Sequence, residues 1–288
     1  MSGVLAERYA SDQMRKIWSR ENKISLERDL WIMVMKAQSN AGFSIDTSMI
    51  SKYERVKSTI DLISIDKRER VLKHDVKARI EEFNSLAGHQ LIHLGMTSRD
   101  LTENVELFQI KTSLEVIENK ALSFLYRLGE KSLSRIDTAL VARTHNVPAQ
   151  VTTLGKRFAT WAEELIFAIK HLQELQRRLP LRGIKGAVGT SQDAIDLLGS
   201  SQSGIDQEIT KALGFETLAI SPSQIYPRSI DFEVLATLVQ LSAAASNMAT
   251  NVRLMSGYGL VSEGFNSCLL YTSPSPRDRT RSRMPSSA

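Results

Sequence analysis

The chain has 288 residues, of which 42% are apolar and 24% are charged, a composition ordinary for a soluble globular protein of one or two domains. No apolar run approaches the length of a membrane span, and the N-terminus lacks the basic start, apolar block and cleavage site of a secretory signal. The single cysteine, Cys268, excludes an internal disulfide framework and a cysteine-based zinc site, so we expect a cytoplasmic protein.

The net charge of +5 is concentrated at the C-terminus. Residues 272–288 hold four arginines against one aspartate, so the rest of the chain is close to neutral. That body carries no zinc-finger or RNP motif and no basic stripe interleaved with aromatic residues. We therefore expect neither a nucleic-acid nor a membrane partner, and the alternative of nucleic-acid binding rests on the arginine tail alone.

Long amphipathic helices dominate the predicted structure. Apolar residues recur at helical spacing over 24–41, from 101 for about seven turns, over 152–179 up to Pro180, and from Pro227 onward. We expect Ser229 to cap the last of these helices, with Asp231 and Glu233 in its first turn. Strand signals are few, so the chain is predicted to be all-α, with a smaller N-terminal helical domain followed by an elongated long-helix bundle.

Three sections follow from this pattern. We expect an N-terminal helical domain over residues 1–96, a central long-helix domain over 97–265, and a disordered tail over 266–288, where proline, serine and arginine replace the apolar stripe. Bundles of such length often bury wide apolar faces against sister subunits, so an oligomer is expected, with a monomeric bundle as the alternative.

Two polar islands interrupt the helices of the first half. The segment "KHDV" holds Lys73, His74 and Asp75, which suit either contact with an anionic ligand or a surface charge cluster. The segment "GMTSRDLTENV" places Thr97 and Ser98 where a long helix begins. Hydroxyls and free backbone N–H groups there suit either an anion site or simple N-capping.

Further islands lie in the second half. "RTHNVPAQVTTLGKRF" places His145, an acid–base candidate or a solvated connector residue, in a break between two helices. "RGIKGAVGT" carries glycines spaced by three, either a tight loop near a ligand or a plain connection. In "QIYPRSIDFEVL", Gln224, Tyr226 and Arg228 either present polar groups to a ligand or cap the bundle end.

In this order, and together with "ERYAS" near the start, these segments resemble the adenylosuccinate lyase family of the fumarase/aspartase superfamily. The resemblance runs from Leu5 to Phe265 almost without gaps. It implies a carbon–nitrogen lyase of purine biosynthesis, which releases fumarate by β-elimination from adenylosuccinate, giving AMP, and from the succinylated imidazole-carboxamide ribotide. It also implies a small-molecule nucleotide substrate, a homotetramer when full length, and no metal or organic cofactor.

The resemblance also implies roles for individual residues. His145 matches the general acid that protonates the leaving nitrogen. Lys73 stands where relatives commonly have arginine, so its contact with an oxyanion loses the bidentate fork. The positions that match substrate contacts are Arg8, Tyr9, Lys73, His74, Asp75, Thr97, Ser98, Thr144 and Gln224.

The catalytic base is the missing part of this assignment. In the family it is a serine of a "GSS-MP-K-N" loop shortly after the segment that matches "LVSEGF", and here "NSCLLYTSPSPRDRTRSRMPSSA" stands in its place. We therefore expect a truncated chain with a foreign tail, inactive alone and without the C-terminal domain. The alternatives are another lyase of the superfamily and a non-catalytic helical scaffold.

Overall fold

The computed structural model describes residues 3–199 and 202–262. The predicted tail over 266–288, Cys268 and the position at which the catalytic loop was expected lie outside the described residues.

The first section consists of short helices around one longer helix. α3 is the longer one, and its apolar positions, among them Leu30, Trp31 and Met35, are almost completely buried. Serine and aspartate side chains cap α2, α3, α4 and α5 by accepting hydrogen bonds from backbone N–H groups of the first turn. The helices of this section are α1 (Val4–Tyr9), α2 (Asp12–Ile17), α3 (Arg20–Asn40), α4 (Thr47–Val56), α5 (Leu62–Leu72) and α6 (Asp75–Ala87).

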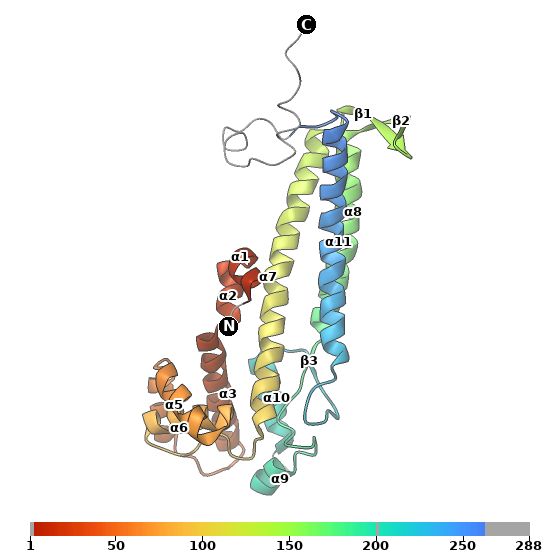
Figure 1. The fold of residues 1–288 in the computed structure, drawn as a ribbon. Coiled ribbons are helices and arrows are strands. Elements are labelled where there is room, and N and C mark those ends of the chain that lie inside the picture. The colour runs from red at the N-terminus through yellow and green to blue at the C-terminus, as the bar shows by residue number, and fades with distance from the viewer. Residues whose placement is uncertain (1–2, 200–201, 263–288) are drawn as a thin grey trace.

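Three long helices form an elongated bundle. α7 (Ser98–Ser134), α8 (Leu154–Arg178) and α11 (Ser229–Gly257) run side by side, and α8 contacts both of the others (Figure 1). The predicted all-α bundle is confirmed. Ser229 was the expected cap of α11 but is its first helical residue; Arg228 holds the cap position, and its side chain makes no capping hydrogen bond to the first turn.

The predicted break between two helices contains strands that the sequence did not predict. The segment around His145 is an antiparallel hairpin of β1 (Ala139–Thr144) and β2 (Val147–Thr153), in which Thr144 pairs with Val147. His145 and Asn146 form its two-residue tip, and both have positive φ, at 51° and 64°. Positive φ at both central residues is the geometry of the turn that best suits a tight hairpin.

The remaining elements lie at the opposite end of the bundle from this hairpin (Figure 1). They are β3 (Pro180–Leu181), which pairs in parallel with β4 (Thr217–Leu218), and the helices α9 (Gln192–Leu198) and α10 (Gln202–Ala212). No helix in the described ranges combines the length and apolar character that a membrane crossing requires.

The two main hydrophobic clusters occupy different parts of the molecule. One joins α3, α4 and α6 to the first turns of α7 and to β3, α10 and the segment before α11, with Leu101 and Leu107 at its centre. The other lies between α7, α8 and α11, around Leu114, Leu165 and Leu172. Because the first cluster spans residue 96, the division of the chain into domains at that point stays a prediction.

The C-terminal end of α7 fits against the start of α8 through a glycine. A Cβ added to Gly155 would lie 2.5 Å from the carbonyl oxygen of Ser132 and 2.8 Å from the Cα of Ile136. Both neighbours are backbone atoms, so neither can move aside as a flexible side chain would. Glycine at this position therefore allows the two helices to meet.

We expect Gly155→Ala to lower the free energy of unfolding by about 2 kcal/mol, the usual cost of overpacking. Gly129→Ala is the control, because a Cβ at that helical glycine meets nothing within 4 Å. That variant should gain up to about 1 kcal/mol from helix propensity. Urea unfolding followed by circular dichroism measures both, and equal effects of the two substitutions would contradict the packing argument.

Candidate functional site

A buried carboxylate organises the start of α7. Asp100 is fully buried, and its Oδ2 accepts a hydrogen bond from the backbone N–H of Thr97 at 2.8 Å, which completes a capping box. Its Oδ1 accepts from the backbone N–H groups of Lys185 at 2.8 Å and Gly186 at 3.0 Å. One side chain therefore connects the N-terminus of α7 to the segment that follows β3.

Arg182 is the cationic partner of Asp100. Its guanidinium is fully buried and donates from Nη1 to Asp100 Oδ1. From Nη2 it donates to the carbonyl oxygens of Gly186 at 3.0 Å and Ser223 at 3.1 Å. The pair thus fixes three segments against one another: the start of α7, the glycine-containing loop after β3, and the loop that leads to α11.

The glycine-containing loop has the tight form that its spacing allowed. Gly183, Gly186 and Gly189 all have positive φ, between 74° and 84°. At Gly189 an added Cβ would lie 1.9 Å from the carbonyl oxygen of Pro222, so the loop packs directly against the backbone before Gln224. The loop is a structural support of the α7 end.

Tyr226 and Arg228 cap the end of the helical bundle, which was one of the two roles that the sequence allowed for them. The backbone N–H of Tyr226 donates to Glu103 Oε2 at 3.1 Å, and Arg228 donates to Glu103 Oε1 at 2.9 Å. The Tyr226 hydroxyl donates to Asp231 at 2.7 Å. Because these groups are engaged with the protein itself, they hold α11 onto α7.

Around this buried support lie several of the predicted substrate contacts. His74 caps α6, its Nδ1 accepting from the backbone N–H of Lys77 at 3.2 Å, and its Nε2 lies 3.4 Å from Ser98 Oγ. Asp75 Oδ1 lies 3.7 Å from His74 Nδ1. The structure thus brings together residues of two islands that are more than twenty positions apart in the sequence, and the side chains of His74 and Asp75 are half exposed.

Two further predicted residues flank this group. Lys73 ends α5 in a left-handed conformation with φ of 56° and lines a shallow cleft with Asp66, Glu69 and Arg70. Gln224 is exposed and directly follows Ser223, which Arg182 holds. We name His74, Asp75, Thr97, Ser98 and Gln224 the α7-start site.

His145 and Thr144 are not part of this site. Both are exposed on the hairpin beyond the other end of α7 (Figure 1). The 37 residues of α7 make it about 55 Å long at the usual helical rise. Arg143 steadies the hairpin tip, because it donates to the Asn146 carbonyl oxygen at 2.8 Å and stacks on the Tyr258 ring at 4.3 Å.

Arg8 and Tyr9 are also separate from the α7-start site. They are exposed on α1, and α2, the next helix, is attached to the middle of α7 by a hydrogen bond from Trp18 Nε1 to Ser113 Oγ at 3.0 Å. The Arg8 guanidinium lies 5.5 Å from the centre of the Tyr9 ring. Within one chain these residues do not meet either His74 or His145.

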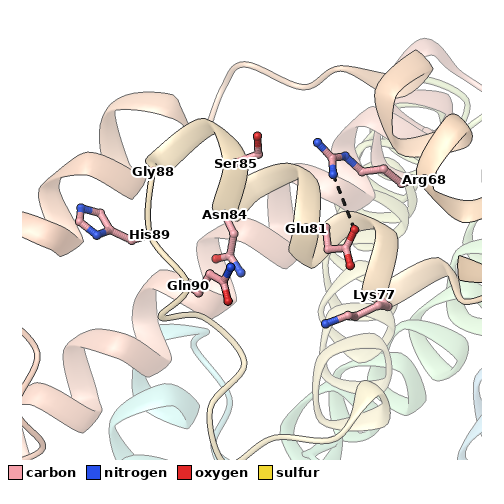
Figure 2. Close-up of a pocket in the computed structure, with 8 residues that line it drawn as sticks. All are labelled: Arg68, Lys77, Glu81, Asn84, Ser85, Gly88, His89 and Gln90. Atoms are coloured by element: carbon pink, nitrogen blue, oxygen red, sulfur yellow. Dashed lines mark ion pairs between the residues drawn. The ribbon is translucent and has the colours of Figure 1, made fainter.

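A polar cleft of about 560 Å³ lies along the exposed face of α6 (Figure 2). Arg68 and Glu81 form an ion pair at 3.6 Å at its side, and none of the predicted site residues lines it. The lining residues are Arg68, Lys77, Glu81, Asn84, Ser85, Gly88, His89 and Gln90. In the part of the chain that the structure describes, no cluster of three or more His, Cys, Asp or Glu side chains could hold a metal ion.

Sequence reasoning missed the supporting residues. Asp100, Arg182 and Glu103 stand inside the polar islands that were singled out, but only their burial shows that they support the site. A signal was present: Asp100 stands three residues after Thr97, the spacing of a capping box. The pairing of Asp100 with Arg182, 82 positions away, carries no local signal.

Residues 7–265 match the model of a family described as Lyase. The chain is 32% identical over 269 residues to an adenylosuccinate lyase of Saccharomyces cerevisiae, covering 91% of this chain and 56% of that protein. It is 32% identical over 282 residues to an adenylosuccinate lyase of Schistosoma mansoni, covering 96% and 58%. The chain therefore spans a little over half the length of these curated relatives.

Solved structures share the fold. A fumarate lyase from Mesorhizobium sp. BNC1 matches with a TM-score of 0.75 at 21% identity, over 87% of this chain and 58% of that one. The 3-carboxy-cis,cis-muconate lactonizing enzyme from Pseudomonas putida matches with a TM-score of 0.76 at 21% identity, over 88% and 58%. At this level of identity the likeness supports the helical architecture alone.

Arg182→Met tests the buried support. Removing one partner of a buried pair leaves Asp100 uncompensated, so we expect the free energy of unfolding to fall by about 3 to 5 kcal/mol. Arg178→Met, which breaks the exposed pair with Glu233, should cost no more than about 1 kcal/mol. Chemical unfolding of both variants makes the comparison, and a small effect at Arg182 would show that the pair supports little.

His93, in the segment between α6 and α7, gives the stability of the fold a pH dependence. Its Nδ1 accepts a hydrogen bond from Trp31 Nε1 at 3.0 Å, and burial lowers its pKa to about 4. The unfolded chain takes up this proton near pH 6.5, so stability is lost as the pH falls from there toward about 4. Asparagine tolerates the positive φ of 68° at this position.

We therefore expect the free-energy difference between the wild type and His93→Asn to shrink by about 3 kcal/mol from pH 6.5 to pH 4. Unfolding curves of both proteins at several pH values provide the measurement. A difference that stays constant over this range would refute the assignment of the slope to His93.

Proposed function

Because this chain belongs to the lyase family, we propose that its residues act in the β-elimination of fumarate from adenylosuccinate, giving AMP, and from the succinylated imidazole-carboxamide ribotide. The observation that carries the proposal is the α7-start site, where His74 and Ser98 from separate segments approach within 3.4 Å over a buried, rigid support.

The α7-start site suits an anionic substrate. Thr97 and Ser98 present hydroxyls at the first turn of a long helix, where the helix dipole favours negative charge. His74 adds an imidazole and Gln224 an amide, both able to donate hydrogen bonds. Such donors would hold the carboxylates of a succinyl group and stabilise the carbanion that forms during elimination.

His145 would be the general acid for the departing nitrogen. Its exposed position leaves the imidazole free to reach a substrate, and the hairpin tip holds it away from the bundle. Because the length of α7, about 55 Å, separates it from Ser98 of the same chain, the acid and the α7-start site have to come from different copies. The proposal therefore includes a homo-oligomer, a homotetramer when full length.

The surface of the long helices supports this assembly. Apolar side chains remain exposed on all three, although such side chains favour burial. They include Tyr126 on α7, Phe167 on α8, and Phe232, Leu235 and Val239 on α11, with exposed fractions from 59% to 69%. A second copy packed along the bundle would cover them and could bring its own hairpin to the α7-start site.

The base that removes the carbon-bound proton has no candidate among the residues of the α7-start site, since His74 is engaged as a helix cap and Asp75 is paired with Arg79. We propose that the 288-residue chain binds the substrate weakly and does not turn it over. Adding to residues 1–265 the C-terminal part of the Saccharomyces cerevisiae relative should restore elimination, measured as the absorbance change of adenylosuccinate.

In that restored protein, His145→Gln should lower kcat by about 10² to 10⁴, the range for a lost general acid. Val147→Ala on the same hairpin is the matched control and should leave kcat within about twofold. A restored protein that assembles but acts on another substrate would point to a different lyase of the superfamily. One that assembles and binds no adenylosuccinate or AMP would point to a scaffold.

Mixing two inactive restored variants tests the assembly. His145→Gln removes the proposed general acid, and Ser98→Ala removes a hydroxyl of the α7-start site. If the two groups of one site come from different copies, random mixing of the two variants leaves about a quarter of the sites with both groups intact. Activity regained on mixing supports the proposal. A mixture as inactive as its components would refute the shared site.

A further inference from the structure

Behind Asp75 lies a carboxylate that the proposed reaction does not use. Glu27 of α3 has an exposed fraction of 0%, and neither of its carboxylate oxygens takes part in a hydrogen bond. A buried carboxylate is costly without a partner. Its presence in the interface of α3 and α6 therefore requires a compensating charge.

Arg79 of α6 supplies that charge. Its Nε lies 2.6 Å from Glu27 Oε2; the N–H is not aimed at the oxygen, so the contact is an ion pair without a hydrogen bond. Nη2 of the same guanidinium donates to Asp75 Oδ2 at 2.9 Å. Arg79 is nearly buried, so a single planar group connects the interior to the half-exposed Asp75.

The two contacts restrict Asp75 more than a surface pair would. An exposed arginine paired with aspartate four positions earlier moves freely and contributes little. Here Glu27 holds the guanidinium at Nε, which leaves Nη2 in one place beside Asp75. Asp75 in turn lies beside His74, whose other nitrogen faces Ser98.

We propose that Glu27 and Arg79 are positioning residues, which hold Asp75, the neighbour of His74, in the orientation that receives substrate. The substrate assigned to that site rests on the proposed function, whereas the positioning itself is a property of this chain. Neither residue touches the ligand; both act through Asp75.

The contact is sensitive to pH near neutrality. Burial raises the pKa of Glu27 to about 7, with Asp75 acting in the same direction and Arg79 and Lys23 opposing it. For Asp75, burial acts upward, but the charge and hydrogen bond of Arg79 outweigh it and lower the pKa. Below pH 7 Glu27 takes up a proton and loses its attraction for Arg79, so the Nε end of the contact is released.

The same two helices provide a matched control. Arg28 of α3 and Glu82 of α6 form another buried ion pair, in which Arg28 also donates to the carbonyl oxygens of Val56, Lys57 and Thr59. It does not contact Asp75. Glu82→Gln therefore weakens the α3–α6 interface as Glu27→Gln does, but leaves the contacts of Arg79 with Glu27 and Asp75 in place.

Nitrogen relaxation of the Arg79 Nε–H group in the 288-residue chain tests the positioning directly. We expect a rigid side chain at pH 8 in the wild type and in Glu82→Gln, becoming mobile as the pH falls below about 7. In Glu27→Gln it should be mobile at both pH values. Equal rigidity of Arg79 in Glu27→Gln and the wild type at pH 8 would overturn the proposal.

Two further variants keep the test decisive if Glu27→Gln does not fold. Arg79→Lys keeps the charge but has no second nitrogen with which to contact both Glu27 and Asp75, and Arg79→Met loses the charge as well. Carbon NMR of the Asp75 carboxyl should show its titration midpoint rising in Arg79→Met and partly restored in Arg79→Lys. An unchanged midpoint in Arg79→Met would also overturn the proposal.

A ligand-binding experiment distinguishes this inference from the proposed function. Adenylosuccinate affinity, measured by calorimetry at pH 8, should fall about tenfold in Glu27→Gln and stay unchanged in Glu82→Gln. Absence of binding to the wild type would contradict the proposed substrate, while the relaxation data would still decide the positioning. Equal losses in both variants would show a general structural effect and refute a role specific to Asp75.

Discussion

The ion pair of Asp100 and Arg182 is the interaction on which the α7-start site depends. A buried pair often contributes little net stability, because both charges lose their hydration. Here backbone N–H groups of Thr97, Lys185 and Gly186 complete the coordination of the carboxylate, which offsets that loss. The ion pair and these N–H groups therefore hold segments that are far apart in the sequence together at one end of α7, where they cannot slide past one another.

The length of α7 is the second constraint. A helix of 37 residues acts as a rigid spacer, and it keeps the hairpin with His145 and the α7-start site at opposite ends. No rearrangement of a single chain that preserves α7 could bring them together. The exposed apolar faces of the long helices and this separation lead to the same requirement, since a neighbouring copy would both cover those faces and supply the distant histidine.

Periodicity predicted the long helices because each has a core-facing stripe, as Leu165 and Leu172 of α8 illustrate. It did not predict the hairpin. Apart from Leu140, the residues of β1 and β2 face no core, so their sequence lacks the alternation by which a strand is recognised. The order of the motifs assigned His74 and Ser98 to the same function. Their contact could not be predicted, because it depends on the packing of the folded chain. The Glu27–Arg79 pair could not be predicted from the sequence either, because nothing in the sequence distinguishes a buried charged residue from an exposed one.

The residues at the tip of the hairpin lower the stability of the fold. Asn-Gly is the sequence that best tolerates two successive left-handed residues, and a hairpin selected for stability alone would carry it. Histidine with φ of 51° is disfavoured there, at a cost on the order of 1 kcal/mol. A library that randomises positions 145 and 146 and is sorted for thermal stability alone should therefore drift toward Asn-Gly, away from the residue proposed as the general acid. If that role is right, stability and activity favour different residues at this one turn.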